Sequence, residues 1–290
     1  MIGSMDEAEI ERIDQALQDW RQGDVALGVD MFMVHLADRR SPLTKASRDA
    51  AEDVSDEYDT FEVLTSVEGL VVVTQTCDII KKCTHCEFVE VSPLIPVSDE
   101  RTLEDVRKGR RPSYAYLPQL AGKRLVADLD RTMTIEKSVL AGWSRVEGCG
   151  TDMERVTFAN ALARKRQRFA FPDGFNAALR KFRNNIKDKN GKNSSEGKLV
   201  ATLREVRVQP TPNWDAPEIE VFFWFLLEPS VFNAEEIGVV RNDIEKWMKR
   251  IEFSGTFVLK HGAFSIVEPR DMSVEDYFGS YAIDYDDVSL

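Results

Sequence analysis

The stretch that decides the fold is GLVVVTQTCDIIKKCTHCEFVEVSPLIPV, residues Gly69–Val97. It holds two apolar, β-branched runs, at 69–75 and at 88–97, and both runs predict strands. Between them lie three of the four cysteines and one of the three histidines of the chain. We therefore expect this stretch to supply the central strands of a small β domain, with a chemically distinctive turn between them.

Strand signals continue on both sides of this stretch. Residues 25–36 predict a strand, and 61–64 is expected to pair with 69–75 as a hairpin. The runs 113–117 and 124–129 predict weaker strands. Many short strands joined by glycine- and proline-containing turns favour a small barrel. Two further segments complete this half of the chain: an amphipathic helix expected over 6–21 and a charged, aperiodic loop expected over 37–60.

The second half of the chain has a different pattern. Thr151 or Asp152 is expected to cap a helix through Arg168, and Asp173 to open another that ends near Lys187. Beyond a flexible connector at 190–198, the order of elements is β-β-α-β-β. The expected elements are strands 199–208 and 219–227, a helix over 233–251, and a hairpin of 256–260 with 263–267. The aromatic residues of 221–225 and Trp247 are assigned to packing.

Three short segments are similar to a known family: Gly23-Asp24-Val25, Gly69–Gln75 and Val89–Ile95. Their succession resembles the strands of PemK/MazF-like proteins over residues 23–97. The resemblance implies an SH3-like barrel, a homodimer and affinity for RNA or DNA, and many family members are sequence-specific endoribonucleases that act as toxins. Gly69-Leu70 and Ile95 stand where that family has its catalytic arginine and threonine. The neighbouring Thr74 and Thr76 are the candidates for RNA cleavage on this resemblance.

We therefore expect an α+β protein in four parts. These are an N-terminal helix (1–22), an SH3-like barrel domain (23–150), a basic helical bridge with a linker (151–198), and an α/β-sandwich domain with an acidic tail (199–290). No apolar run is long enough to span a membrane and no signal peptide is recognisable, so a cytoplasmic location with reduced cysteines is expected.

The charge distribution is uneven. The net charge is -12, yet residues 155–192 hold eleven Lys and Arg against two Asp, which leaves about -21 for the rest. Mixed with phenylalanines, these cations have the composition that holds phosphates and stacks on bases. The predicted nucleic-acid-binding residues are Arg155, Arg164, Lys165, Arg166, Arg168, Arg180, Lys181 and Arg183. A solvated helix face, or an internal partner for the acidic tail, is the alternative.

The cysteine-rich turn admits three interpretations. Cys77, Cys83 and Cys86, with either His85 or the distant Cys149 as the fourth ligand, suit a tetrahedral zinc site, and zinc is the one cofactor that the sequence suggests. Alternatively, Cys77 is a nucleophile at a strand end, with Asp78 and either His35 or His85 in support. In the third interpretation, Cys77 is a small buried apolar residue and Asp78 caps a turn.

Three functions follow as hypotheses. The preferred one is a protein that binds nucleic acid or another phosphate-bearing ligand, with a toxin-like or phage-defence role and RNA cleavage as its extension. The second is a thiol enzyme that uses Cys77. The third is a non-catalytic interaction protein that engages a basic partner through its acidic tail and residues 37–60.

Overall fold

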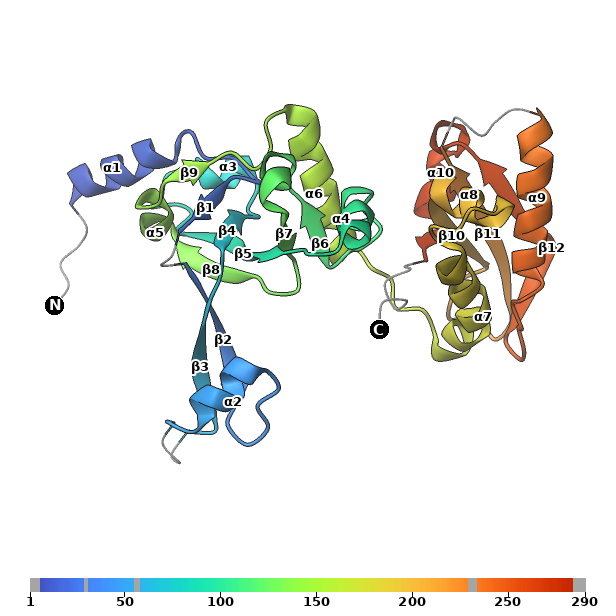
Figure 1. The fold of residues 1–290 in the computed structure, drawn as a ribbon, viewed down its shortest axis with the longest axis horizontal. Helices are drawn as coiled ribbons and strands as arrows, with labels where there is room; N and C mark the ends of the chain where they lie inside the picture. The colour runs from blue at the N-terminus through green and yellow to red at the C-terminus, as the bar shows by residue number, and fades with distance from the viewer. Residues whose placement is uncertain (1–5, 29–30, 55–57, 229–233, 284–290) are drawn as a thin grey trace. The chain divides into compact units, whose positions relative to one another are not determined.

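A computed structural model of the chain describes residues 6–28, 31–54, 58–228 and 234–283 (Figure 1). The chain divides into two compact units, Met1–Gln167 and Arg168–Leu290. Both combine helices with sheets, which confirms the α+β class. The segment 151–198, expected as one basic bridge, is shared between the two units. No helix in these described ranges is long and apolar enough to cross a membrane.

A seven-stranded sheet forms the centre of the first unit, in the order β6-β7-β5-β4-β1-β9 with β8 also paired to β5. The strands are β1 Val25–Leu27, β4 Gly69–Val72, β5 Phe88–Pro96, β6 Tyr114–Tyr116, β7 Leu125–Asp128, β8 Met133–Glu136 and β9 Arg145–Val146. Both strands predicted in the opening stretch are confirmed as β4 and β5, which are antiparallel neighbours with Val71 opposite Ser92. The long strand β5 pairs in turn with β8, β4 and β7.

The barrel prediction is wrong. In the part of the chain that the structure describes, no sheet closes on itself: the path ends at β6 on one side and at β9 on the other. Closure needs the two terminal strands to pair along a shared length. Here β9 is two residues long and pairs with β1, while β6 is three residues long and pairs with β7. The sheet is therefore open.

The predicted hairpin of 61–64 with 69–75 is also wrong. Strand β3 (Thr60–Ser66) pairs with β2 (Phe32–Asp38) as a separate two-stranded ribbon, and β4 pairs with β1 and β5. At Gly69 a Cβ would lie 2.5 Å from the backbone oxygen of Ala26, so β4 can approach β1 because this position has no side chain. The expected loop 37–60 contains helix α2 (Lys45–Ala51), which lies beside the ribbon (Figure 1).

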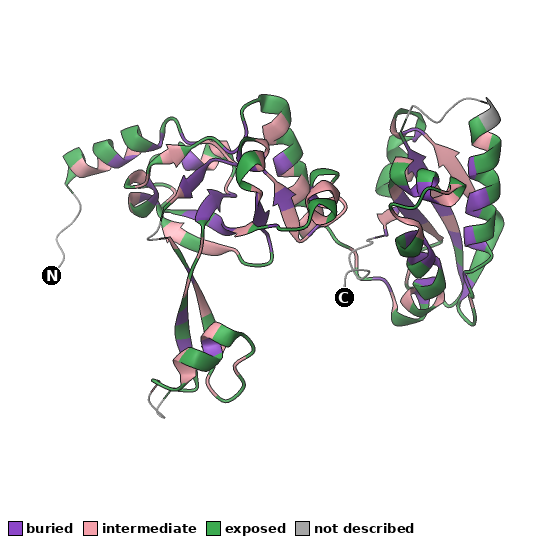
Figure 2. Cartoon of the chain, viewed as in Figure 1, coloured by how far each residue is buried: buried purple, intermediate pink, exposed green. Residues whose placement is uncertain are grey.

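Strands β4 and β7 are buried along their whole length, because the central sheet is covered on both faces at these strands (Figure 2). Leu70 and Val72 pack in one cluster with Leu17 of the N-terminal helix, and Val71 packs in another with Phe158. Besides α2, the helices of this unit are α1 Glu7–Leu17, α3 Thr76–Ile79, α4 Glu100–Arg107, the 3-10 helix η1 Pro118–Lys123, α5 Lys137–Ala141 and α6 Asp152–Arg166. The predicted N-terminal helix is confirmed.

The second unit packs helices on a four-stranded sheet of order β12-β11-β10-β13. Its elements are α7 Asp173–Lys189, α8 Ser195–Thr202, β10 Leu203–Thr211, β11 Ile219–Leu227, α9 Ala234–Met248, β12 Phe257–Val267, the 3-10 helix η3 Pro269–Asp271, α10 Val274–Phe278 and β13 Tyr281–Ala282. The expected flexible connector instead contains the start of α8, which Ser194 caps by accepting from the Gly197 N–H. Consequently β10 begins later than predicted.

The predicted hairpin of 256–267 is a single strand. All of β12 runs parallel to β11, and the pairing shifts where Leu259 lies opposite Val221 and Phe264 lies opposite Phe223. Gly262, at φ +86°, and Ala263, at φ +42°, form this bulge. A glycine at positive φ is as typical of a bulge as of a hairpin turn, which explains the wrong prediction.

The aromatic residues of β11 point to both sides of its sheet. Phe223 and Phe225 pack in the core with Trp247, as predicted. Phe222 and Trp224 alternate with them and are half-buried, and the Trp224 indole N–H donates to Oε1 of Gln209 at 3.0 Å. The packing assignment therefore holds for one face of the strand, while the other two rings lie outside the core cluster.

Candidate functional site

Helix α6 positions the cations with the clearest surroundings. Thr151, one of the two predicted caps, starts the helix: its hydroxyl accepts from the Glu154 N–H at 3.2 Å. The Glu154 carboxylate accepts in return from the Thr151 N–H, which completes a capping box. Midway along, Phe158 is fully buried against the sheet. These two fixed points set where the last turn, Arg164-Lys165-Arg166, lies.

The cap of α6 gives a first test of this positioning. We expect Thr151→Ala to lower the free energy of unfolding of the first unit by about 1 kcal/mol, because it leaves a helix N–H without its acceptor. Urea denaturation of the full chain measures this value. Thr157→Ala is the matched control: its exposed hydroxyl bonds to the Met153 carbonyl within the helix, and alanine favours helix more than threonine does. A loss as large in the control would contradict the capping role.

The three cations of the last turn have different surroundings. Arg164 donates from Nη1 to the backbone oxygen of Gly109, and Lys165 pairs with Asp130. Both interactions attach the end of the helix to neighbouring loops. Arg166 lies 3.9 Å from a carboxylate oxygen of Glu90, beyond hydrogen-bonding distance, and its side chain is 66% exposed. Arg166 is therefore the most accessible cation of this turn.

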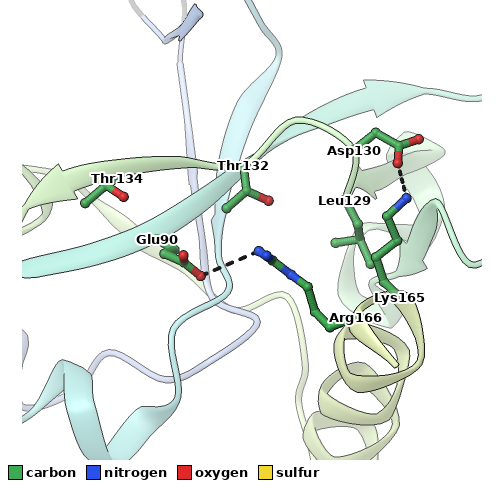
Figure 3. A pocket seen from close by; sticks show the side chains of 7 residues that line it. All are labelled: Glu90, Leu129, Asp130, Thr132, Thr134, Lys165 and Arg166. Carbon is green, nitrogen blue, oxygen red and sulfur yellow. Dashed lines mark hydrogen bonds and ion pairs between the residues drawn. The ribbon is translucent and has the colours of Figure 1, made fainter. Parts of the chain in front are cut away.

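Arg166 borders a polar cavity of about 410 Å³ on the first unit. Figure 3 shows its lining side chains, which come from β5, from the loop before β8, from β8 itself and from the end of α6. Glu90 and Thr134 lie directly opposite each other on β5 and β8, so their side chains share one face of the sheet. The lining residues are Glu90, Leu129, Asp130, Thr132, Thr134, Lys165 and Arg166.

The formal charges around the cavity cancel, since Lys165 and Arg166 face Asp130 and Glu90 (Figure 3). The two pairs are not equivalent. The Lys165 side chain is the more buried of the two cations, and its ammonium contacts Asp130 directly. Arg166 and Glu90 are 66% and 53% exposed, and an exposed pair held this loosely contributes about 0–1 kcal/mol. An incoming anion can therefore replace Glu90 as the partner of Arg166 with little loss of free energy.

The remaining predicted nucleic-acid-binding residues are placed elsewhere. Arg155 lies near the start of α6 and pairs with Asp152 at 3.0 Å. The other four residues belong to the second unit. Lys181 pairs with Glu252 at 2.6 Å, Arg183 is buried, and Arg168 and Arg180 are exposed. Within the first unit, the structure thus brings together three of the predicted cations, Arg164, Lys165 and Arg166.

Thr74 and Thr76 have structural contacts. The Thr74 hydroxyl accepts from the backbone N–H of Glu90 at 2.6 Å, which connects the end of β4 to β5. The Thr76 hydroxyl accepts from the backbone N–H of Gln22 at 3.1 Å. Neither residue lines the cavity. Thr74 nevertheless fixes the backbone from which the Glu90 side chain projects.

The cysteine-rich turn does not form the expected zinc site. All four cysteines are free, with Cys77 exposed and Cys83 buried. Among the residues that the structure describes, no three His, Cys, Asp or Glu side chains are grouped so that they could hold a metal ion. Burial and the Asp14 carboxylate also raise the pKa of the Cys83 thiol, which disfavours the thiolate that zinc binds. The assignment of zinc to Cys77, Cys83, His85 and Cys86 is therefore corrected.

Cys77 has little of the support that a nucleophile needs. Its Sγ lies 3.7 Å from Oε1 of Gln75, and the Asp78 carboxylate pairs with Lys81 at 2.5 Å. Within the described ranges, no hydrogen bond joins Cys77 to His35 or His85. Helix α3, which carries Cys77, is four residues long. The arrangement contains no base positioned to activate the thiol.

Sequence reasoning missed the other half of the cavity: Glu90, Asp130, Thr132 and Thr134. Glu90 carries a signal, because it alternates with buried Val89 and Val91 and must face outward. Asp130, Thr132 and Thr134 carry no such signal, since β8 and the loop before it are absent from the elements that the sequence predicts.

Comparison of the chain with protein-family models, with curated proteins and with solved structures found no match. The chemistry of the cavity therefore has to be argued from its own residues.

Proposed function

We propose that the first unit binds nucleic acid by holding a backbone phosphate with Arg166 at the polar cavity. One observation carries this proposal: an exposed guanidinium projects over a cavity and is held loosely, at 3.9 Å, by a single exposed carboxylate. A guanidinium presents a planar fork of donors that matches phosphate oxygens. A phosphate is therefore a better partner for Arg166 than the distant Glu90 carboxylate.

The other lining groups suit the same ligand. Thr134 presents an exposed hydroxyl, which can donate a hydrogen bond to a phosphate oxygen, while the Thr132 hydroxyl is hydrogen-bonded to the Ser92 hydroxyl at 3.1 Å. A cavity of about 410 Å³ lies in the range of ordinary small-ligand sites, so it accommodates one nucleotide. We infer that the ligand is single-stranded, or has an unpaired nucleotide that enters the cavity.

The resemblance of residues 23–97 to PemK/MazF-like proteins supports the same class of ligand. The catalytic arginine and threonine of that family are missing, and Thr74 and Thr76 have structural hydrogen bonds. We therefore propose binding as the function, without that family's cleavage chemistry.

The test is the affinity of the full chain for a labelled single-stranded oligonucleotide. We expect Arg166→Ala to weaken binding about tenfold, since a charge-assisted hydrogen bond contributes about 1.5–3 kcal/mol. The slope of log affinity against log salt concentration should also become shallower by about 1, the change expected when one phosphate contact is lost.

Arg12→Ala is the matched control, because Arg12 is likewise an exposed cation paired with a carboxylate, Glu9, but lies on α1. We expect this variant to bind like the wild type. Equal affinity and equal salt dependence of Arg166→Ala and the wild type would overturn the proposal.

A further inference from the structure

The cavity has a feature that phosphate binding alone does not explain, namely the carboxylate of Glu90. An ionised carboxylate accepts hydrogen bonds and donates none. Once Arg166 has turned to a phosphate, Glu90 faces an anion without its former partner. Like charges repel, and near a protein surface they repel more strongly than in bulk water. A ligand that tolerates Glu90 must offer it a donor.

The position of Glu90 is well defined. Its backbone N–H donates to the Thr74 hydroxyl at 2.6 Å, and its backbone oxygen accepts from the Val73 N–H at 3.0 Å. The side chain stands opposite Thr134 on the face that carries the cavity, and Figure 3 shows it pointing across the cavity toward Arg166. Cation and carboxylate thus approach a bound ligand from two different elements, α6 and β5.

A ribonucleotide carries a phosphate and a hydroxyl donor side by side. Its 2′-hydroxyl lies next to the 3′-phosphate, and proteins use this group to distinguish RNA from DNA. Acidic side chains that accept hydrogen bonds from ribose hydroxyls are a recurring device in nucleotide sites.

We propose that Glu90 determines the specificity of the cavity: it competes with phosphate for Arg166 and favours ligands that place a hydroxyl donor beside the phosphate. The proposal rests on the proposed binding of nucleic acid at this site. A ribonucleotide satisfies Arg166 and Glu90 together. A deoxynucleotide satisfies Arg166 and leaves Glu90 against the phosphate. The threonines do not discriminate in this way, because a hydroxyl both donates and accepts.

The experiment measures affinities for three oligonucleotides of one sequence: RNA, DNA and 2′-O-methyl RNA. We expect the wild-type chain to bind RNA about tenfold more tightly than DNA, as expected for one hydrogen bond to a charged acceptor. The 2′-O-methyl RNA should bind like DNA, because methylation removes the donor.

Variants at Glu90 separate the two parts of the proposal. Glu90→Ala should bind DNA more tightly than the wild type does, because the competing carboxylate is gone, and should lose the preference for RNA. Glu90→Gln keeps an acceptor without the charge, so its DNA affinity and its preference for RNA should lie between those of the wild type and Glu90→Ala. Both variants are expected to fold, since the hydrogen bonds that fix this position use the backbone. Glu87→Ala is the control, an exposed carboxylate outside the cavity.

The outcomes distinguish this inference from the proposed function. If the wild type binds RNA and DNA equally, and Glu90→Ala changes neither affinity, Glu90 has no role in specificity although nucleic-acid binding stands. If Arg166→Ala weakens RNA and DNA binding by the same factor while the RNA preference disappears in Glu90→Ala, both are supported. Absence of binding to all three oligonucleotides overturns both.

Discussion

Replacing Arg207 with alanine is expected to destabilise the second unit by about 3–5 kcal/mol, the cost of removing one partner from a buried ionic network. Arg207 is 8% exposed on β10. Its Nε donates to the Ser280 hydroxyl at 2.9 Å, and its Nη2 donates to the backbone oxygens of Ser280, at 2.6 Å, and Tyr277, at 2.9 Å. The guanidinium also lies 3.9 Å from the centre of the Tyr277 ring and bonds to Glu205. One side chain thus holds α10 and β13 against the sheet.

The measurement is hydrogen exchange over residues 273–283 in the full chain, together with urea denaturation. In Arg207→Ala, the amides of this segment should exchange much faster than in the wild type, because the segment has lost its main attachment to β10. Arg207→Lys should fall between the two, since it keeps the charge without the planar fork. Arg204→Ala, an exposed position on the same strand, should change neither quantity. Unchanged exchange in Arg207→Ala would show that β13 pairing alone holds the segment.

The parts of this fold that the sequence predicts correctly depend on local signals. The apolar runs of β4 and β5, the amphipathic α1 and the helix cap at Thr151 are each decided by a few consecutive residues. Strand pairing is not local. Phe61–Leu64 has the right composition for a hairpin with β4, yet it pairs with β2, because Gly69 brings β4 close to β1 instead. Closure of a barrel likewise depends on pairing between distant strands, which composition does not encode.

In the candidate site, too, local features are predictable from the sequence and contacts between distant residues are not. The basic run Arg164-Lys165-Arg166 is visible in the sequence, and the structure places Lys165 and Arg166 at the cavity. Counting charges along the chain does not show that Asp130 and Glu90 reach two of these cations. The cations of α6 and α7 also belong to different units, so a local excess of charge in the sequence does not define one surface. Arg166 remains the residue on which the binding proposal depends.

Lys137 is a cation whose structural role the sequence does not predict, because nothing in the sequence marks it as buried. It is 1% exposed, and its ammonium donates to the backbone oxygens of Asp78, at 2.7 Å, and Lys81, at 2.6 Å. These carbonyls belong to α3 and the turn that follows it, in the cysteine-rich stretch. Lysine is almost never fully buried without such partners. Lys137 therefore holds the turn after β4 in place, and the described residues of this stretch contain no group of His, Cys, Asp or Glu that could hold a metal ion there.

Replacing Lys137 with methionine, which has a similar shape and no charge, is expected to destabilise the first unit by about 2–4 kcal/mol, because two partly buried carbonyls lose their donor. Lys82→Met, an exposed position in the same turn, is the control and should cost less than about 0.5 kcal/mol. Urea denaturation measures both variants. A cost in Lys137→Met as small as in the control would mean that these carbonyls find other donors.

The pH dependence separates the charge of Lys137 from its hydrogen bonds. Burial lowers its pKa below the ordinary 10.5, although Cys86, Asp14, Cys83 and Asp78 oppose this shift. Between the lowered and the ordinary pKa, the unfolded chain binds more protons at this site than the folded chain does, so stability rises with pH. The neutral amine still donates to both carbonyls. The stability advantage of the wild type over Lys137→Met should therefore grow as pH rises from 7 toward 10.5. A constant or shrinking difference would show that the ammonium is not destabilised by burial.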